Sequence, residues 1–143
     1  MKKIAVIYWS GTGNTEIMAE AIGDGAKVNG DSVKLIRVED ATKEDVINSD
    51  LIAFGCPSMG NEVLEEEFME PFIESLEDVD FSGKTIALFG SYDWGDGEWM
   101  RDWEERMENY GAKLVDEGLI IRLTPEDEDI EKCKELGKKL ANS

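Results

Sequence analysis

The sequence contains no histidine, only two cysteines and three prolines, and far fewer basic than acidic residues. Without histidine, the chain can form no histidine-based catalytic triad, histidine general base or histidine metal site. Cys56 and Cys133 give neither a metal-binding spacing nor a disulfide framework, and they fit a reducing cytoplasm. These absences exclude much enzyme chemistry before any motif is considered.

Long apolar runs and excess positive charge are also missing. The longest apolar segments, at residues 4–8, 51–54, 86–89 and 119–121, are far shorter than the ~18 residues of a membrane span. The basic, apolar start of the chain runs directly into a polar loop, so we expect no targeting segment and a cytoplasmic location. The formal net charge of -18 would repel nucleic acid and anionic membranes, and it would attract basic proteins.

The basic residues are also unevenly distributed. No Lys or Arg occurs between Lys43 and Lys84, whereas acidic residues recur throughout that segment. The pattern indicates either a solvated acidic helix face or a binding face shaped by its negative field. The sequence leaves both interpretations open.

What remains is an ordinary globular composition with 41% hydrophobic residues, which predicts one domain over residues 1–143. Apolar runs alternate with segments of helical spacing along the whole chain. The predicted strands are residues 4–8, 32–38, 51–56 and 86–91, with a fifth at 113–116 and 119–123 that is interrupted at Gly118. The predicted helices are residues 15–28, 42–48, 99–110 and 125–140.

One further helical segment, residues 62–76, contains Pro71. Because proline in mid-helix costs roughly 3 kcal/mol, we expect two pieces: a short helix near residues 63–69 and a helix that begins with Pro71. Five apolar strands that alternate with helices predict an α/β fold, in which helices cover both faces of a parallel sheet.

Six residues between the first strand and the first helix have the composition of a phosphate-binding loop. Glycines allow a tight turn in which several N–H groups converge, hydroxyls add donors, and the helix N-terminus adds partial positive charge. The loop lacks the Lys of a Walker A motif, and Glu16 follows where a dinucleotide fingerprint would continue toward its third glycine. We predict a phosphate cradle without a cationic side chain; the alternative is a polar turn that only caps the helix. The six residues are Ser10, Gly11, Thr12, Gly13, Asn14 and Thr15.

Two more loops follow the third and fourth strands, at residues 56–62 and 90–97. In a doubly wound sheet, ligands bind outside the carboxyl ends of the strands, where all three loops would lie. Met59 and Trp94 could hold a flat aromatic ligand between them. Because acidic residues and glycines surround Trp94, we place it in the site, whereas the helical spacing of Trp99 and Trp103 predicts core positions.

The segments WSGTGNTE, GCPSMGNEVLEE and GSYDWGDGEWM resemble the signature loops of flavodoxins, in particular those of the short-chain, clostridial type. The resemblance covers essentially the whole chain. It implies a doubly wound five-stranded parallel sheet of strand order 2-1-3-4-5, with helices on both faces. It also implies that the protein binds FMN non-covalently and shuttles single electrons between redox enzymes.

The resemblance assigns a role to each loop. The first loop would hold the FMN phosphate, Met59 would lie on the inner face of the isoalloxazine and Trp94 on the outer face. The Gly60–Asn61 peptide would face flavin N5, and Glu62 would accept a hydrogen bond from flavin N3–H. The expected cofactor-binding residues are Ser10, Gly11, Thr12, Gly13, Asn14, Thr15, Ser58, Met59, Gly60, Asn61, Glu62, Ser91, Tyr92, Asp93, Trp94 and Gly95.

Two of these residues depart from the family pattern. Asp93 stands where the family often has glycine, which adds a charge to the loop expected at the pyrimidine edge. Asn61 stands where Asp or Ser also occurs in the family, and asparagine should be compatible with that pattern. Because the fully reduced flavin is an anion, an acidic chain predicts a low potential for the second electron.

The resulting prediction is a low-potential one-electron carrier, not an enzyme with its own substrate. Its expected partners are basic-faced redox proteins that dock transiently near the flavin edge, and the protein is expected to be a monomer. The alternative is an FMN-dependent reductase of quinones or metals on the same fold, which would need a second-substrate site over the flavin. A small phosphatase would need Cys and Arg in the first loop, and a response-regulator receiver would need an acidic pair after the first strand; neither is present.

Overall fold

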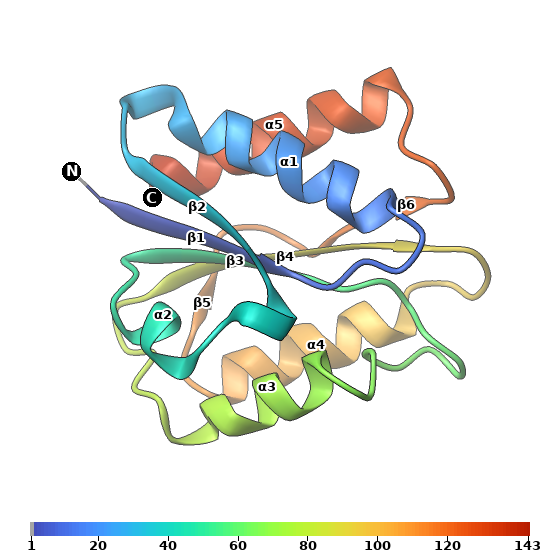
Figure 1. The fold of residues 1–143 in the computed structure, drawn as a ribbon, viewed down its shortest axis with the longest axis horizontal. Coiled ribbons are helices and arrows are strands. Elements are labelled where there is room, and N and C mark those ends of the chain that lie inside the picture. The colour runs from blue at the N-terminus through green and yellow to red at the C-terminus, as the bar shows by residue number, and fades with distance from the viewer. Residues whose placement is uncertain (1) are drawn as a thin grey trace.

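A parallel sheet lies between two layers of helices in the computed structural model, which describes residues 2–143 (Figure 1). The strand order is β2-β1-β3-β4-β5, and β6 also pairs in parallel with β4. The fifth strand is therefore interrupted as predicted, and the order 2-1-3-4-5 is confirmed. The strands are β1 Lys3–Tyr8, β2 Ser32–Arg37, β3 Leu51–Gly55, β4 Thr85–Tyr92, β5 Lys113–Leu114 and β6 Leu119–Arg122.

Helices α1 and α5 cover one face of the sheet, and α2, α3 and α4 lie on the other (Figure 1). Within residues 2–143, no helix is both long and apolar enough to cross a membrane. The helices are α1 Asn14–Ala26, α2 Lys43–Ile47, α3 Met69–Ser75, α4 Glu98–Asn109 and α5 Asp127–Ala141.

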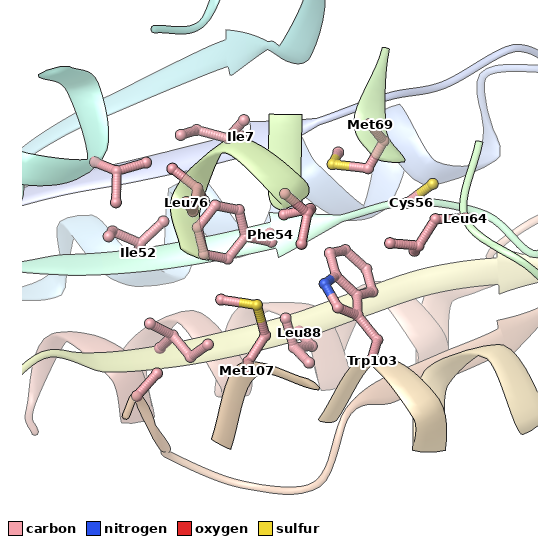
Figure 2. Close-up of a cluster of buried hydrophobic side chains, with 14 of the residues drawn as sticks. Ile7, Ile52, Phe54, Cys56, Leu64, Met69, Leu76, Leu88, Trp103 and Met107 are labelled. Carbon is pink, nitrogen blue, oxygen red and sulfur yellow. The ribbon is translucent and has the colours of Figure 1, made fainter. Parts of the chain in front are cut away.

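Each face of the sheet has its own hydrophobic core. On the side of α3 and α4, Trp103 and Met107 of α4 pack with Phe54 of β3 (Figure 2). The central strands β1, β3 and β4 are almost entirely buried, as their continuous apolar runs predict. The edge strand β2 is half exposed, which explains its mixed sequence.

Helices α1 and α5 approach each other closely at two glycines. A Cβ atom on Gly25 of α1 would lie 2.0 Å from the carbonyl oxygen of Lys134 in α5. A Cβ atom on Gly137 of α5 would lie 2.1 Å from the carbonyl oxygen of Ile22 in α1. The two helices therefore pack backbone against backbone, and neither position tolerates a side chain.

The predicted short helix over residues 63–69 is wrong. Val63 instead pairs with Met59 in an isolated antiparallel bridge, so the chain is extended there. The buried carboxylate of Glu65 then accepts hydrogen bonds from the three backbone N–H groups that precede and begin α3. These donors are Glu67 at 2.7 Å, Phe68 at 2.7 Å and Met69 at 2.9 Å.

Pro71 is the third residue of α3 and not the first, which corrects the predicted helix start. The first four N–H groups of a helix have no intrahelical acceptor, so proline loses no hydrogen bond at this position. The C-terminal helix likewise begins at Asp127, two residues after Pro125, where Glu126 and Asp129 form a capping box. Proline thus marks both helix starts to within two residues.

Candidate functional site

Three loops meet at the carboxyl ends of β1, β3 and β4 and surround a cavity of about 400 Å³. This edge is where β1 lies between β2 and β3, so the strand order reverses here. Eight of the predicted site residues line the cavity, together with three that sequence reasoning missed. The lining residues are Trp9, Gly11, Thr12, Asn14, Pro57, Ser58, Met59, Ser91, Tyr92, Asp93 and Leu123.

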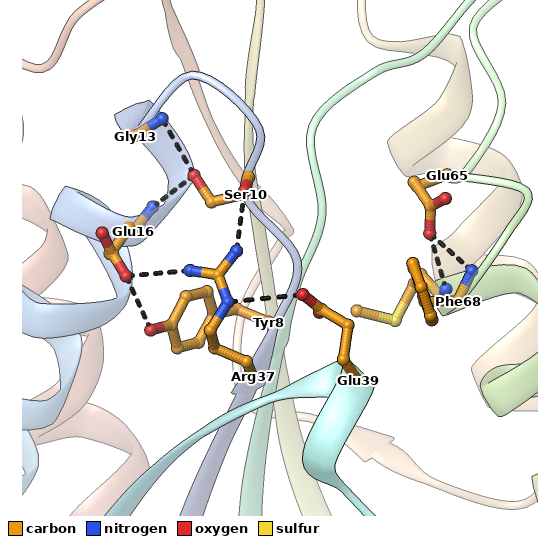
Figure 3. Close-up of polar contacts among 9 residues, drawn as sticks. Tyr8, Ser10, Gly13, Glu16, Arg37, Glu39, Glu65 and Phe68 are labelled. Carbon is orange, nitrogen blue, oxygen red and sulfur yellow. Dashed lines mark hydrogen bonds and ion pairs between the residues drawn. The ribbon is translucent and has the colours of Figure 1, made fainter.

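The first loop presents unpaired backbone N–H groups. No acceptor within residues 2–143 takes the N–H groups of Gly11, Thr12, Asn14 and Thr15. The Ser10 hydroxyl oxygen closes the loop from inside, because it accepts hydrogen bonds from the N–H groups of Gly13 and Glu16, each at 3.2 Å (Figure 3). Convergent free N–H groups at a helix N-terminus form an anion site.

Gly13 gives this loop its shape. It is the N-cap residue of α1, with φ 100°, a conformation that glycine adopts without strain. Gly13 has no side chain to cap the helix, and the Ser10 hydroxyl takes only the N–H of Glu16 in the first turn, so the N–H groups of Asn14 and Thr15 stay open to a ligand. A polar turn that only caps α1 would use the Ser10 hydroxyl in the same way, so the four free N–H groups are the feature that favours an anion site.

Direct hydrogen bonds join the three loops. The hydroxyl groups of Thr15 and Ser91, both buried, lie 2.8 Å apart and link the first loop to the third. The Ser58 N–H donates to the carbonyl oxygen of Ser91 at 3.0 Å, which links the second loop to the third. Trp99 of α4 donates its indole N–H to the carbonyl oxygen of Cys56 at 3.1 Å, so the start of the second loop is also fixed.

The second loop is a narrow hairpin whose tip is residues 60–62. Met59 and Val63 exchange two backbone hydrogen bonds, of 2.9 and 3.0 Å, at its base. Gly60 has φ 50° and no atom within 4 Å of an added Cβ, whereas Asn61 does not take the positive φ that a type II turn over residues 59–62 would require there. Glu62 takes it instead, with φ 57°.

The unusual backbone of Glu62 accompanies an inward-facing side chain. Its carboxylate Oε1 accepts hydrogen bonds from the N–H groups of Gly97 and Glu98, each at 3.1 Å, at the N-terminus of α4. Negative charge is favourable at this end of a helix. The same carboxylate lies where a side chain on Gly95 would stand, with Oε1 2.5 Å from an ideal Cβ. Glu62 therefore braces the second loop against the third.

The core prediction for Trp99 and Trp103 is confirmed, whereas Trp94 is not among the residues that line the cavity, and its place in the site stays a prediction. Trp94 is 58% exposed at the tip of the third loop, and Trp99 and Trp103 are buried in the core. Trp9 was missed as a site residue, although its ring lies over Gly11, with Cη2 2.9 Å from where a Cβ would stand. Its position directly after β1 and before the first loop is a signal that could have found it.

Arg37, which does not line the cavity, was also missed by sequence reasoning. The first loop contains no cation, as predicted, but Arg37 lies against it and donates from Nη2 to the carbonyl oxygen of Ser10 at 2.9 Å (Figure 3). The parallel register of β1 and β2 pairs Arg37 with Tyr8, the last residue of β1. Strand pairing therefore contained the signal, since it places Arg37 next to the loop.

Cys56 lies at the start of the second loop, and its side chain belongs to the core on the side of α3 and α4. It is buried, and burial raises the pKa of its thiol to about 12. Its sulfur accepts a hydrogen bond from the N–H of Glu65 at 3.3 Å. Within residues 2–143, no cluster of three or more His, Cys, Asp or Glu side chains could hold a metal ion.

A larger hollow of about 670 Å³ lies between residues 116–119 and α5. Charged side chains border it, among them Asp116 and Lys139, which form an ion pair of 2.9 Å. It contains neither a glycine loop nor a helix N-terminus. The chemistry for binding an anionic ligand is therefore at the three-loop cavity.

The fold and this cavity together define a class: doubly wound α/β proteins that hold a phosphorylated cofactor at the strand-order reversal through backbone N–H groups. Comparison with known proteins narrows the class. The flavodoxin family model matches residues 6–137. The chain is 52% identical to a flavodoxin of Clostridium beijerinckii over 137 residues, which cover 96% of this chain and 98% of the relative.

A flavodoxin of Megasphaera elsdenii is 41% identical over 98% of this chain and 99% of its own. The solution structure of the two-electron reduced M. elsdenii protein superimposes with a TM-score of 0.87, covering 98% of this chain and 99% of that one. The chain belongs to the flavodoxin family. It is an electron carrier that uses FMN, not an enzyme with its own substrate, and its partners are redox proteins.

Proposed function

We propose that this carrier holds FMN across the three loops, with the phosphate in residues 10–15 and the isoalloxazine between Met59 and Trp94. The observation that carries the proposal is the group of four backbone N–H donors in the first loop without an acceptor in residues 2–143. Donors of this kind fit a phosphate dianion and need no lysine. The cavity beside them is lined by Met59 and by aromatic residues, as a flat ring system requires.

When bound, FMN supplies the one-electron chemistry, and the chain's own residues set its surroundings. The second loop keeps its base fixed through the Met59–Val63 pair while its tip, at Gly60, has room to change conformation. The carboxylates of Glu62 and Asp93 place negative charge in the loops around the ring. We propose that this charge keeps the potential of the second electron low.

The docking surface would be the exposed edge around Trp94. Because the chain carries a net charge of -18, we propose partners with basic faces, whose association slows as salt rises. The same charge argues against nucleic acid and anionic membranes, and it supports a monomer. Residues 1–143 would form a single FMN-binding domain. The free, buried thiols of Cys56 and Cys133 support a cytoplasmic location.

The test is calorimetric titration of the apoprotein with FMN and with riboflavin, which lacks the phosphate. Thr12→Val removes a hydroxyl from the first loop and should weaken FMN binding by roughly 1–3 kcal/mol, the value of a charge-assisted hydrogen bond. Thr85→Val, at the amino end of β4, makes the same chemical change away from the loops and should have no effect on binding. Equal affinities for FMN and riboflavin would refute the phosphate assignment.

A further inference from the structure

One guanidinium group ties together the two ends of the first loop. Arg37 donates from Nη2 to the carbonyl oxygen of Ser10 at 2.9 Å, before the turn, and from Nη1 to Oε2 of Glu16 at 3.0 Å, after it (Figure 3). Its Nε faces Glu39 at 3.4 Å, and its Cζ lies 5.5 Å from the centre of the Tyr8 ring. A planar fork with several donors suits this bridging role, whereas a lysine ammonium does not.

The hydrogen bonds of Ser10 extend the connection to the loop itself. Arg37 holds the Ser10 carbonyl group on one side, while the Ser10 hydroxyl oxygen accepts the N–H groups of Gly13 and Glu16 on the other. Arg37, Ser10 and the first turn of α1 therefore form one network. A change in the orientation of Arg37 would pass directly to the peptide groups that point into the cavity.

Glu16 makes the charge of Arg37 important. It is the acidic residue in the first turn of α1, next to the proposed phosphate position, so its carboxylate would repel a phosphate dianion. Arg37 and the Tyr8 hydroxyl both donate to the same oxygen, Oε2, and hold the carboxylate on the β2 side. Burial, and then the hydrogen bond to Glu16, raise the pKa of Tyr8, so it stays a neutral donor.

Glu39 adds a second carboxylate to the same cluster. Without Arg37, two negative groups would lie near the loop with no cation between them. The pair is not deeply buried: the side chains of Arg37 and Glu16 are 37% and 41% exposed. Ion pairs with this exposure contribute little to folding stability, so stability alone gives little reason for the arrangement.

We propose that Arg37 is a positioning residue for the phosphate of FMN, which orients the Ser10 peptide and neutralises Glu16 without touching the ligand. This inference rests on the proposed placement of the phosphate in residues 10–15. It predicts that Arg37 contributes to the binding of the phosphate group and not to the binding of the isoalloxazine or the ribityl chain.

The experiment compares apoprotein variants by their dissociation constants for FMN and riboflavin, measured by quenching of flavin fluorescence. We expect Arg37→Gln to weaken FMN binding about tenfold and riboflavin binding less than about twofold. Arg37→Lys keeps the charge but loses the planar fork of donors, so its affinity for FMN should lie between those of the unchanged protein and Arg37→Gln. Lys34→Gln, an exposed position of the same strand, removes one positive charge without a comparable contact and should change neither constant.

The double variant Arg37→Gln with Glu16→Gln provides a rescue. If Arg37 acts partly by neutralising Glu16, removal of both charges should recover part of the lost FMN affinity, and no recovery would overturn that part of the proposal. Equal weakening of FMN and riboflavin by Arg37→Gln, or no weakening at all, would overturn the positioning role. Thr12→Val distinguishes a failure of the positioning role of Arg37 from a failure of the proposed phosphate placement. If Thr12→Val leaves FMN binding unchanged, the phosphate placement itself is wrong.

Discussion

A side chain at Gly95 would test whether Glu62 braces the second loop against the third. Gly95 has φ 91°, and an added Cβ would lie 2.5 Å from the Glu62 carboxyl carbon and from Oε1. The carboxylate is the far end of a flexible side chain, so it would rotate away. That rotation would leave the N–H groups of Gly97 and Glu98 without their acceptor.

The cost of Gly95→Ala then has two parts. A non-glycine residue in this backbone region costs about 1–2 kcal/mol. Loss of a hydrogen bond to a charged group costs about 1.5–3 kcal/mol, and two such bonds are at risk, although water replaces part of each. We expect a total loss of about 3–4 kcal/mol in the free energy of unfolding.

Gly83 supplies the matched control. It has φ 82°, in the turn before β4, and nothing lies within 4 Å of its added Cβ. Gly83→Ala should therefore cost only the backbone part, about 1–2 kcal/mol. Urea unfolding of both apoproteins, followed by tryptophan fluorescence, measures the difference, and FMN affinity should fall only for Gly95→Ala. Equal costs for the two variants would refute the bracing role of Glu62.

Two substitutions test separate parts of the site, and a change of pH tests the burial of the two thiols. Gly60→Thr puts a β-branched side chain at φ 50° and should disfavour at least one of the conformations that the tip of the second loop adopts as FMN is reduced. The first-electron potential should therefore fall in a potentiometric titration with FMN still bound. An unchanged potential would mean that the tip does not move on reduction. Asp93→Asn should raise the second-electron potential by roughly 20–40 mV at low salt and less at high salt, because the fully reduced flavin is an anion. No rise at low salt would place this carboxylate away from the ring. Burial raises the pKa of the Cys56 and Cys133 thiols to about 12, from 9.0, so the folded protein keeps protons that the unfolded chain loses, and stability to urea should fall as the pH rises between these values. Native protein at pH 8 should react with thiol reagents only as it unfolds, and a fast reaction would contradict the burial.

The sequence pattern predicted the central strands and the long helices because their apolar residues recur with the period of the element. Residues 4–8 and 51–56 read as continuous apolar runs, and both proved to be buried strands. The tryptophans of α4 followed from their four-residue spacing. The strand order came from the family resemblance, since the pattern of elements alone does not determine it.

The segment between the second loop and α3 could not be predicted in the same way. Leu64 and Phe68 have helical spacing, which favours a helix over residues 63–69. The tertiary contacts decide otherwise: Val63 is held in a bridge to Met59, and the Glu65 carboxylate replaces the missing turn by capping α3. A carboxylate that caps a helix from three or four residues upstream leaves no periodic signal.

Half of the sixteen predicted site residues line the cavity, and their contacts with the cofactor stay a prediction. The loops themselves follow from glycines and hydroxyls at strand ends. Arg37 and Trp9 were missed for different reasons. Arg37 comes from an edge strand and reaches the site only through its pairing with β1, whereas Trp9 precedes the glycine loop and resembles the last residue of a strand.

The close crossing of α1 and α5 at Gly25 and Gly137 has a consequence for biosynthesis. Translation makes α1 well before α5, so the side of α1 that packs against α5 has no partner until α5 is made, whereas β1 and β2, which also contact α1, are available earlier. The backbone contact then forms only when α5 has left the exit tunnel. A nascent chain stalled before residue 127 should therefore bind chaperones through α1, whereas a chain extended by a linker beyond residue 143 should not.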